Sequence, residues 1–243
     1  MENNPALSRA VEDYLAAIYK LSTVGGGATT TSLALEMGVS PAASTNMIKK
    51  LAGSQLVDYV PYRSIVLTLS GEQRALKIVR RHRLIESFLS AVLGIGWDQA
   101  HDEAHRLEHD LSDYLEDQID TYLGNPTEDP HGDPIPTKEG AVALDTLQSL
   151  LELQPGMSAI IRRVTGLESE HLRYLQELGL VPKATVKVIE AAPFEGPLRV
   201  SVGSREHSLS HQLAGHIRVG RLPGTSPILS ESNDASIPTP SES

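Results

Sequence analysis

Apolar residues recur at intervals of three and four along much of the first half of the chain, as at Val11, Leu15 and Ile18. This spacing places apolar side chains on one face of a helix and predicts a series of helices. Thr30, Thr31 and Ser40 are the expected caps of two short ones. The predicted helices cover residues 8–22, 30–37, 40–52 and 70–93, followed by a helix that Asp98 caps and an acidic helical segment that ends near 123.

Two other parts of the chain have the composition of β-strands. Residues 56–69 are rich in Val, Ile, Leu, Tyr and Thr and predict a β-hairpin interrupted at 61–64. After a connector rich in Pro and Gly, short apolar runs predict a small β-barrel with one helix. The connector covers 124–140, the runs are 159–164, 185–189 and 198–202, and the helix covers 168–178.

The composition limits the class of protein. The chain has 243 residues, enough for two or three domains, and 40% of them are hydrophobic. It has no cysteine, which excludes disulfides, thiolate metal sites and cysteine nucleophiles. The N-terminus is unlike a signal peptide, and no apolar stretch is long enough to span a bilayer. We therefore expect a soluble, cytoplasmic protein that does not enter the membrane.

The net charge of −10 is distributed unevenly. Residues 1–83 hold 10 Lys and Arg against 6 Asp and Glu, whereas residues 84–150 hold 2 against 15. A basic N-terminal part joined to a very acidic middle indicates two binding functions, one for a polyanion and one for cations.

A helix, a glycine turn, a second helix and a hairpin follow one another in the order of a winged helix-turn-helix. Ala34 allows close helix packing and Gly38 permits the turn. The alternative is a generic helical subdomain with solvated lysines, but the hairpin and the positive charge favour DNA binding. Polar side chains of the second helix suit the major groove, and basic ones suit phosphates. The expected DNA-contacting residues are Ser40, Ala42, Ala43, Thr45, Asn46, Lys49, Lys50 and Arg63.

The stretch HDEAHRLEH at 101–109 concentrates metal-binding chemistry on one helix. At 100° per residue, His101, His105, Glu108 and His109 share a stripe about 100° wide. Imidazole and carboxylate are ligands that divalent Mn, Fe, Co, Ni and Zn prefer. The alternative is a solvated helix face that binds nothing.

A second pair, His82 and Glu86, stands four residues apart on the preceding predicted helix. Either set of side chains alone is more often a solvated group on the protein surface than a metal site. Together, within the acidic middle of the chain, they favour metal binding. Four other histidines are expected to have no role in metal binding: His131, His207, His211 and His216.

Several stretches in the right order resemble the diphtheria toxin repressor and manganese transport regulator family of metal-dependent transcription factors. They are EDYLAAIYKL at 12–21, the helix-turn-helix at 30–52, RHRLIESFL at 81–89, HDEAHRLEH at 101–109 and PHGDPIP at 130–136. The resemblance implies a mainly α fold with a small β part. It implies a winged helix-turn-helix at 1–75, a helical metal-binding and dimerisation domain at 76–148, an SH3-like (FeoA-like) barrel at 153–222 and a disordered tail at 223–243.

By position, the resemblance also implies two metal sites. The primary site would comprise Asp13, His105, Glu108 and His109. The ancillary site would comprise His82, Glu86 and His101, to which a weaker alignment adds Glu168 and His171.

The primary set departs from both branches of the family. Iron-type members have methionine at the position of Asp13 and cysteine at that of His105, whereas manganese-type members have glutamate at the position of His105. Short manganese-type members also have a glutamate where this chain has Ala16. Without sulfur ligands, Mn(II) is the first expectation and Fe(II) the second. Zn(II), Co(II), Ni(II) or Cd(II) are expected to substitute in vitro, since intrinsic affinity does not follow availability.

The resemblance implies a homodimer that binds an inverted-repeat DNA operator when metal is bound, and that represses genes of metal homeostasis. Asp13 lies on the first helix, so we expect metal to replace repulsion between Asp13 and Glu108 by attraction and to fix that helix. The rivals are a dinuclear metalloenzyme that uses the same ligands and a metal-storage protein. No nucleophile motif supports an enzyme, and two metal sites per chain would give a storage protein little capacity.

Overall fold

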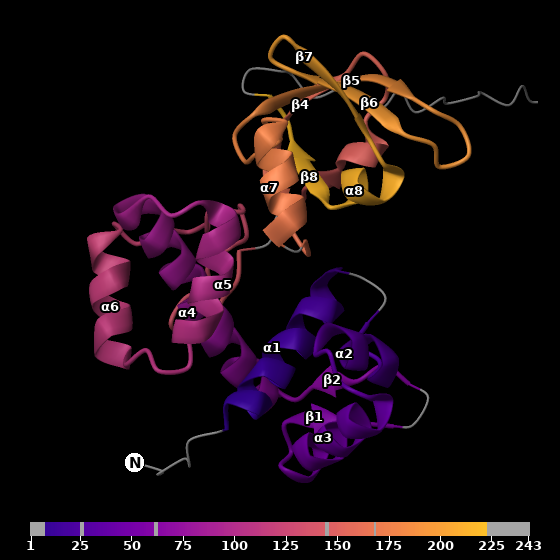
Figure 1. Ribbon diagram of the computed structural model, residues 1–243. Coiled ribbons are helices and arrows are strands. Elements are labelled where there is room, and N and C mark those ends of the chain that lie inside the picture. Colours follow the sequence, from indigo (N-terminus) through magenta and orange to yellow (C-terminus); the bar gives the residue numbers. More distant parts are fainter. Residues whose placement is uncertain (1–7, 25–26, 61–62, 144–145, 168, 223–243) are drawn as a thin grey trace, which may run out of the picture.

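The computed structural model describes residues 8–24, 27–60, 63–143, 146–167 and 169–222. Two groups of helices and a β-sheet domain make up the molecule (Figure 1). This architecture confirms the predicted mainly α fold with a β domain at the C-terminal end. The predicted tail at 223–243 lies outside the described residues. Within the described ranges, no helix is both long and apolar enough to cross a membrane.

The first group has the order of a winged helix-turn-helix. Its elements are α1 (Arg9–Val24), α2 (Thr30–Glu36), α3 (Pro41–Gly53), β1 (Val57–Asp58) and β2 (Val66–Leu67), of which the last two form an antiparallel hairpin. Gly38 adopts a φ of 62°, and the Val39 N–H donates to the Ala34 carbonyl at 3.0 Å, which closes the turn between α2 and α3. Thr29, rather than Thr30 or Thr31, caps α2 by accepting from the Ser32 N–H, since its own backbone is still extended.

The three helices of this group share one apolar core. Leu15 and Ile18 of α1 are fully buried with Leu33 of α2 and with Ile48 and Leu51 of α3. Because close-packed cores transmit displacement, α1 cannot move independently of α3. The first helix is therefore mechanically tied to the helix that is expected to contact DNA.

The second group consists of α4 (Leu69–Leu93), α5 (Trp97–Leu107) and α6 (Asp113–Tyr122). The long helix α4 begins beside the hairpin and continues into this group (Figure 1). Thr68 is its N-cap, and the helix begins at Leu69, one position before the predicted start. Asp98 does not cap α5 as predicted, because Gly96 occupies the N-cap position and Asp98 lies in the first turn.

A buried ion network joins α4 to α6. The Arg80 Nε and Arg81 Nε atoms donate to the two carboxylate oxygens of Glu116 at 2.9 and 3.0 Å. Arg80 also reaches Asp120 at 2.6 Å, and Arg81 reaches Asp113 at 2.6 Å. The Glu116 side chain is only 3% exposed, so its charge depends on both arginines.

The C-terminal domain is built on one antiparallel sheet with strand order β3-β8-β4-β5-β6-β7. Its elements are β3 (Gln148–Ser149), a 3₁₀ turn (Leu150–Glu152), β4 (Ser158–Val164), α7 (Ser169–Glu177), β5 (Thr185–Ala191), β6 (Leu198–Val202), β7 (Arg205–Leu209), α8 (His211–Gly215) and β8 (Ile217–Gly220). The polar strand β7 and the short strand β8 were not predicted, because neither has the apolar run on which the sequence argument relied.

This domain rests on the first half of α5. Trp97 of α5 packs within the core of the sheet domain. The Arg173 Nε of α7 donates to Asp98 at 3.0 Å, and the Ser169 hydroxyl donates to Asp102 at 3.1 Å. The domain therefore helps to position the helix that carries most of the predicted metal ligands.

Replacing Glu116 by Ala should lower the free energy of unfolding by about 3–5 kcal/mol, since two arginines would remain buried without their shared carboxylate. Denaturant titration followed by circular dichroism measures the change. The control is Asp117→Ala on the same helix, which removes a half-exposed ion pair with Lys138 and should alter the unfolding midpoint little. Equal midpoints for the two variants would contradict this account of the network.

Candidate metal centre

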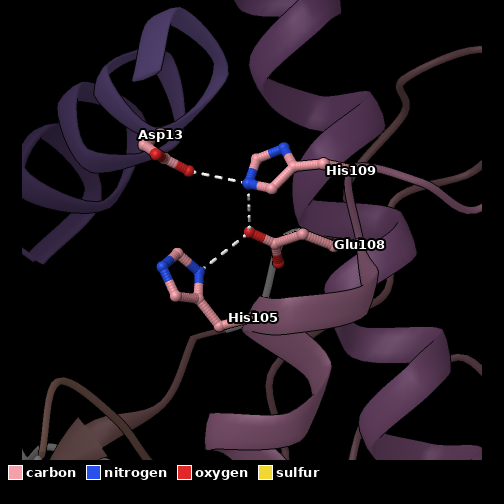
Figure 2. Close-up of side chains that lie close together, drawn as sticks. All are labelled: Asp13, His105, Glu108 and His109. Atoms are coloured by element: carbon pink, nitrogen blue, oxygen red, sulfur yellow. Dashed lines mark hydrogen bonds and ion pairs between the residues drawn. The ribbon is translucent and has the colours of Figure 1, made fainter. Parts of the chain in front are cut away.

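Four side chains from two parts of the chain converge at one point, which we call cluster one (Figure 2). Asp13, His105, Glu108 and His109 each offer a ligand atom, and these atoms lie within 4.8 Å of one another. The His109 Nε2 is 2.8 Å from Asp13 Oδ1 and 3.3 Å from Glu108 Oε1. The His105 Nδ1 is 2.9 Å from the same Glu108 oxygen.

Cluster one joins α1 to the C-terminal end of α5. Asp13 projects from α1, whereas His105 lies in the last turn of α5. Because α5 ends at Leu107, Glu108 is its C-cap and His109 lies in the following turn. The predicted helical stripe is therefore interrupted at its end, although the side chains still meet. The side chains of Glu108 and His109 are only 4% and 6% exposed, whereas that of His105 is 61% exposed.

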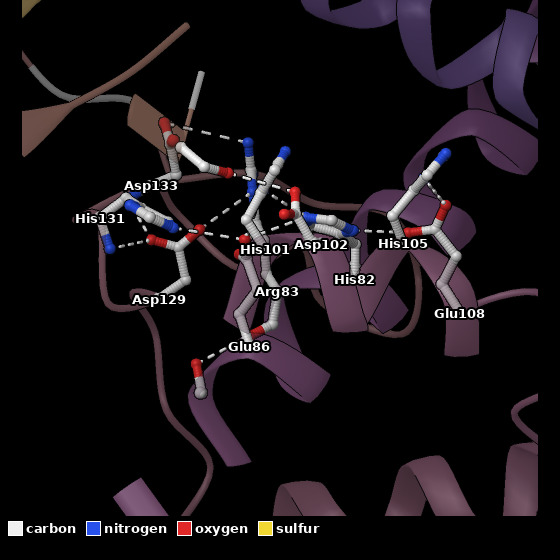
Figure 3. A network of polar contacts seen from close by, with 12 residues as sticks. His82, Arg83, Glu86, His101, Asp102, His105, Glu108, Asp129, His131 and Asp133 are labelled. Carbon is white, nitrogen blue, oxygen red and sulfur yellow. Dashed lines mark hydrogen bonds and ion pairs between the residues drawn. The ribbon is translucent and has the colours of Figure 1, made fainter. Parts of the chain in front are cut away.

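His82, Glu86 and His101 form a second convergence, cluster two, between α4 and α5 (Figure 3). The Glu86 Oε1 is 3.0 Å from His82 Nε2 and 2.7 Å from His101 Nδ1. The two ring nitrogens are themselves 3.1 Å apart. Both predicted sets of side chains thus come together, and their role as metal ligands stays a prediction.

Opposite charges dominate both clusters. Burial lowers the pKa of His82, but the carboxylates of Glu86 and Glu108 outweigh this effect and raise it to about 10. Burial alone would raise the pKa of Glu86, yet the charge of His82 and hydrogen bonds from His101 and His131 hold it well below its ordinary value. The carboxylates therefore lie against imidazoles. Asp13 and Glu108, which were expected to repel each other without metal, both lie beside Nε2 of His109.

Two contacts were missed by the sequence analysis. The Glu12 Oε2 is 2.7 Å from His109 Nδ1, so this carboxylate orients the imidazole from outside cluster one. His131, expected to have no role in metal binding, is buried and places its Nε2 3.3 Å from Glu86 Oε1. The adjacent acidic residues Glu12 and Asp13 could have indicated the contact of Glu12, since a metal-binding histidine usually needs a partner for its second nitrogen. For His131, nothing in the local pattern indicated the contact.

Several predicted residues lie elsewhere. His171 is exposed on α7 and belongs to neither cluster, and Glu168 lies outside the described residues. In the helix-turn-helix, Ala42, Ala43, Asn46, Lys49, Lys50 and Arg63 are exposed. The Ser40 hydroxyl caps α3, and the half-buried Thr45 hydroxyl donates to the Pro41 carbonyl at 2.7 Å. These two hydroxyls therefore already have partners within the helix.

The residues of cluster one fit a divalent cation. Asp13 Oδ1 is buried without a hydrogen-bond partner among the described residues, although His109 Nε2 is close to it. A buried carboxylate oxygen without a donor is unusual in folded proteins, and a bound cation would satisfy it. Two carboxylates and two imidazoles are also the ligand types that first-row divalent metals prefer.

Comparison with known proteins agrees with this arrangement. Residues 6–65 match the model of the iron dependent repressor, N-terminal DNA binding domain, and residues 68–137 match that of its metal binding and dimerisation domain. Residues 148–221 match the FeoA domain. The iron-dependent repressor IdeR of Mycobacterium tuberculosis is 30% identical over 230 residues, which cover 87% of this chain and 96% of the relative.

The chain belongs to the diphtheria toxin repressor and manganese transport regulator family of metal-dependent transcriptional regulators. Solved members of this family have the same fold. A manganese-dependent transcriptional repressor in complex with manganese superposes with a TM-score of 0.81 at 36% identity, covering 87% of this chain and 100% of the other. ScaR with bound Cd²⁺ superposes with a TM-score of 0.78 at 32% identity, covering 87% and 99%.

Without metal, the stability of this family member should fall as the pH rises. The pKa of folded His82 is about 10, against about 6.5 in an unfolded chain. Its stabilising effect is therefore fully present below pH 6.5 and is lost as the pH rises towards 10. Unfolding titrations in chelator between pH 6.5 and 10 measure the slope. His82→Ala should flatten it, and an unaltered slope would contradict the assignment; His211→Ala, on α8, is the control.

Proposed function

We propose that this chain is a metal-activated, DNA-binding repressor in which clusters one and two hold divalent cations. The observation that carries the proposal is the meeting of Asp13 on α1 with Glu108 and His109 after α5. The family of the chain and the exposed polar face of α3 support the DNA-binding part. The proposed division of labour assigns DNA to residues 1–75, metal and dimerisation to 76–148 and a supporting role to 153–222.

The proposed ligands of cluster one are Asp13, His105, Glu108 and His109. Those of cluster two are His82, Glu86 and His101, with His131 as a further candidate because its Nε2 lies beside Glu86. His131 is buried, its Nδ1 has no hydrogen-bond partner in the described part of the chain, and its Nε2 lies 3.3 Å from Glu86 Oε1. A nitrogen-rich cluster two and a more oxygen-rich cluster one would then coexist.

We infer that Mn(II) is the physiological cation, with Fe(II) as the second candidate. Oxygen and imidazole ligands without sulfur suit both ions. Relatives of the chain are named as manganese-dependent and iron-dependent repressors, which fits either ion. Zn(II), Co(II) and Ni(II) should also bind in vitro, because intrinsic affinity rises along the first-row series towards copper. Binding of Cd(II) is supported by the solved structure of ScaR with bound Cd²⁺.

A homodimer on an inverted-repeat operator is the proposed active form. Large apolar side chains stay exposed on the second group of helices, which suits a self-complementary contact between two copies. They are Val92, Leu93, Leu107, Tyr114, Leu115 and Tyr122. Two recognition helices related by a twofold axis would contact two half-sites, so their separation must match the DNA.

The proposed switch acts through α1. A divalent cation supplies the charge that lets Asp13, Glu108 and two neutral imidazoles share one point. Asp13 then holds α1 against the end of α5, and the common core carries this constraint to α3. The cation shifts the protein towards the arrangement that binds DNA only if it binds more tightly when α1 is held against α5 than when α1 is free.

Asp13→Ala should abolish metal-activated DNA binding without unfolding the protein. Loss of a direct ligand should weaken Mn(II) binding at cluster one by more than the roughly 10- to 100-fold that loss of an outer-shell partner costs. The measurement is a DNA-binding titration on the upstream region of a metal-transporter gene, with Mn(II), Fe(II), Zn(II) or chelator. Asp117→Ala on α6 is the control. The mechanism would be contradicted if metal stimulated DNA binding by Asp13→Ala as much as by the wild type.

Two substitutions on α3 should separate affinity from specificity. Lys49→Gln should weaken binding to all DNA sequences alike and reduce the salt slope by about 1, because a phosphate contact is lost. Asn46→Ala should cost about 1–3 kcal/mol and relax the preference at one base pair. Fluorescence anisotropy at several salt concentrations measures both effects, with Lys187→Gln on β5 as the control. A Lys49→Gln slope that matches the control would place α3 away from the phosphates.

A further inference from the structure

The two clusters are joined through the imidazole of His82 (Figure 3). Its Nε2 faces cluster two, at 3.0 Å from Glu86 Oε1 and 3.1 Å from His101 Nδ1. Its Nδ1 faces the other way and lies 2.6 Å from Glu108 Oε2. One ring therefore contacts a candidate ligand of each cluster.

The two carboxylate oxygens of Glu108 also face different clusters. Its Oε1 faces cluster one, where His105 Nδ1 and His109 Nε2 are 2.9 and 3.3 Å away. Its Oε2 is the atom that contacts His82. The side chains of Glu108 and His82 are only 4% and 17% exposed, so water competes little for this contact.

We propose that His82 is a positioning residue for cluster one in addition to a ligand of cluster two. This inference rests on the proposed function. A ligand carboxylate is oriented more firmly when its second oxygen is held, and hydrogen bonds outside the ligand shell commonly supply that restraint. The N–H at Nδ1 of His82 donates to Glu108 Oε2 and thereby keeps Oε1 directed at cluster one.

The restraint is compatible with occupation of both clusters. An imidazole that binds a cation through Nε2 carries its remaining proton on Nδ1, where it is available to Glu108. Asp13 and Glu108 together neutralise a divalent ion in cluster one, which limits the repulsion that an ion in cluster two would meet. His101 provides the contrast, because it contacts Glu86 and His82 but has no contact with Glu108 among those of the described residues.

The inference predicts different consequences for two losses in cluster two. His82→Ala should weaken Mn(II) binding at cluster one by about 10- to 100-fold, the range measured for outer-shell partners of metal ligands. His101→Ala should remove a cluster-two ligand and leave cluster one close to the wild type. Calorimetric titration of the full chain with MnCl₂ measures both sites, and the heat that disappears in Asp13→Ala identifies cluster one.

Two polar substitutions test the role of each ring nitrogen and avoid an empty space at position 82. The amide nitrogen of His82→Asn lies near the place of Nδ1 and can still donate to Glu108. That of His82→Gln lies near the place of Nε2 and cannot. Cluster-one affinity should therefore be retained by the Asn variant and lost by the Gln variant.

The outcomes separate this inference from the proposed function. Equal cluster-one affinities in His82→Gln, His82→Asn and the wild type would overturn the positioning role while leaving metal binding intact. An equal loss in His82→Ala and His101→Ala would also overturn it, since the effect would follow cluster two as a whole. A wild-type chain that binds no Mn(II) at cluster one would instead contradict the proposed function itself.

Discussion

The functional arrangement depends on one buried imidazole, that of His109, which lies between the first helix and the acidic end of α5. Its Nδ1 meets Glu12, and its Nε2 meets both Asp13 and Glu108. Three carboxylates around one ring are stable only with a compensating positive charge. A divalent cation can supply it, with more ligands and stricter geometry.

The helix α5 connects this point to the rest of the molecule. At its first residue, Trp97 enters the core of the C-terminal domain, and at its last turn His105 and the following Glu108 face α1. Cluster two lies between, where α5 faces α4. Since α1 and α3 share a core, a restraint placed on α1 reaches the surface that is proposed to contact DNA. In the proposed mechanism, packing between helices therefore links metal binding to DNA binding.

The sequence was most informative where the relation between residues is local. The intervals of His82 and Glu86 and of His101, His105 and Glu108 follow from helical periodicity, so they could be predicted without knowing the fold. The role of Asp13 as a metal ligand was predicted only from the family resemblance, because the residues around it in space are distant in the chain. Glu12 and His131 were missed for the same reason: their contacts are set by tertiary packing. The polar strand β7, REHSL, was missed because its stabilising pairing lies entirely in β6.

The central claim is that a divalent cation ties Asp13 to Glu108 and His109, and so α1 to α5. Its most direct test is the anomalous difference density of crystals grown with Mn(II), recorded on both sides of the manganese absorption edge. The account predicts a manganese peak within coordination distance of Asp13, Glu108 and His109. A peak bound only by the residues after α5, with Asp13 turned away, would contradict it.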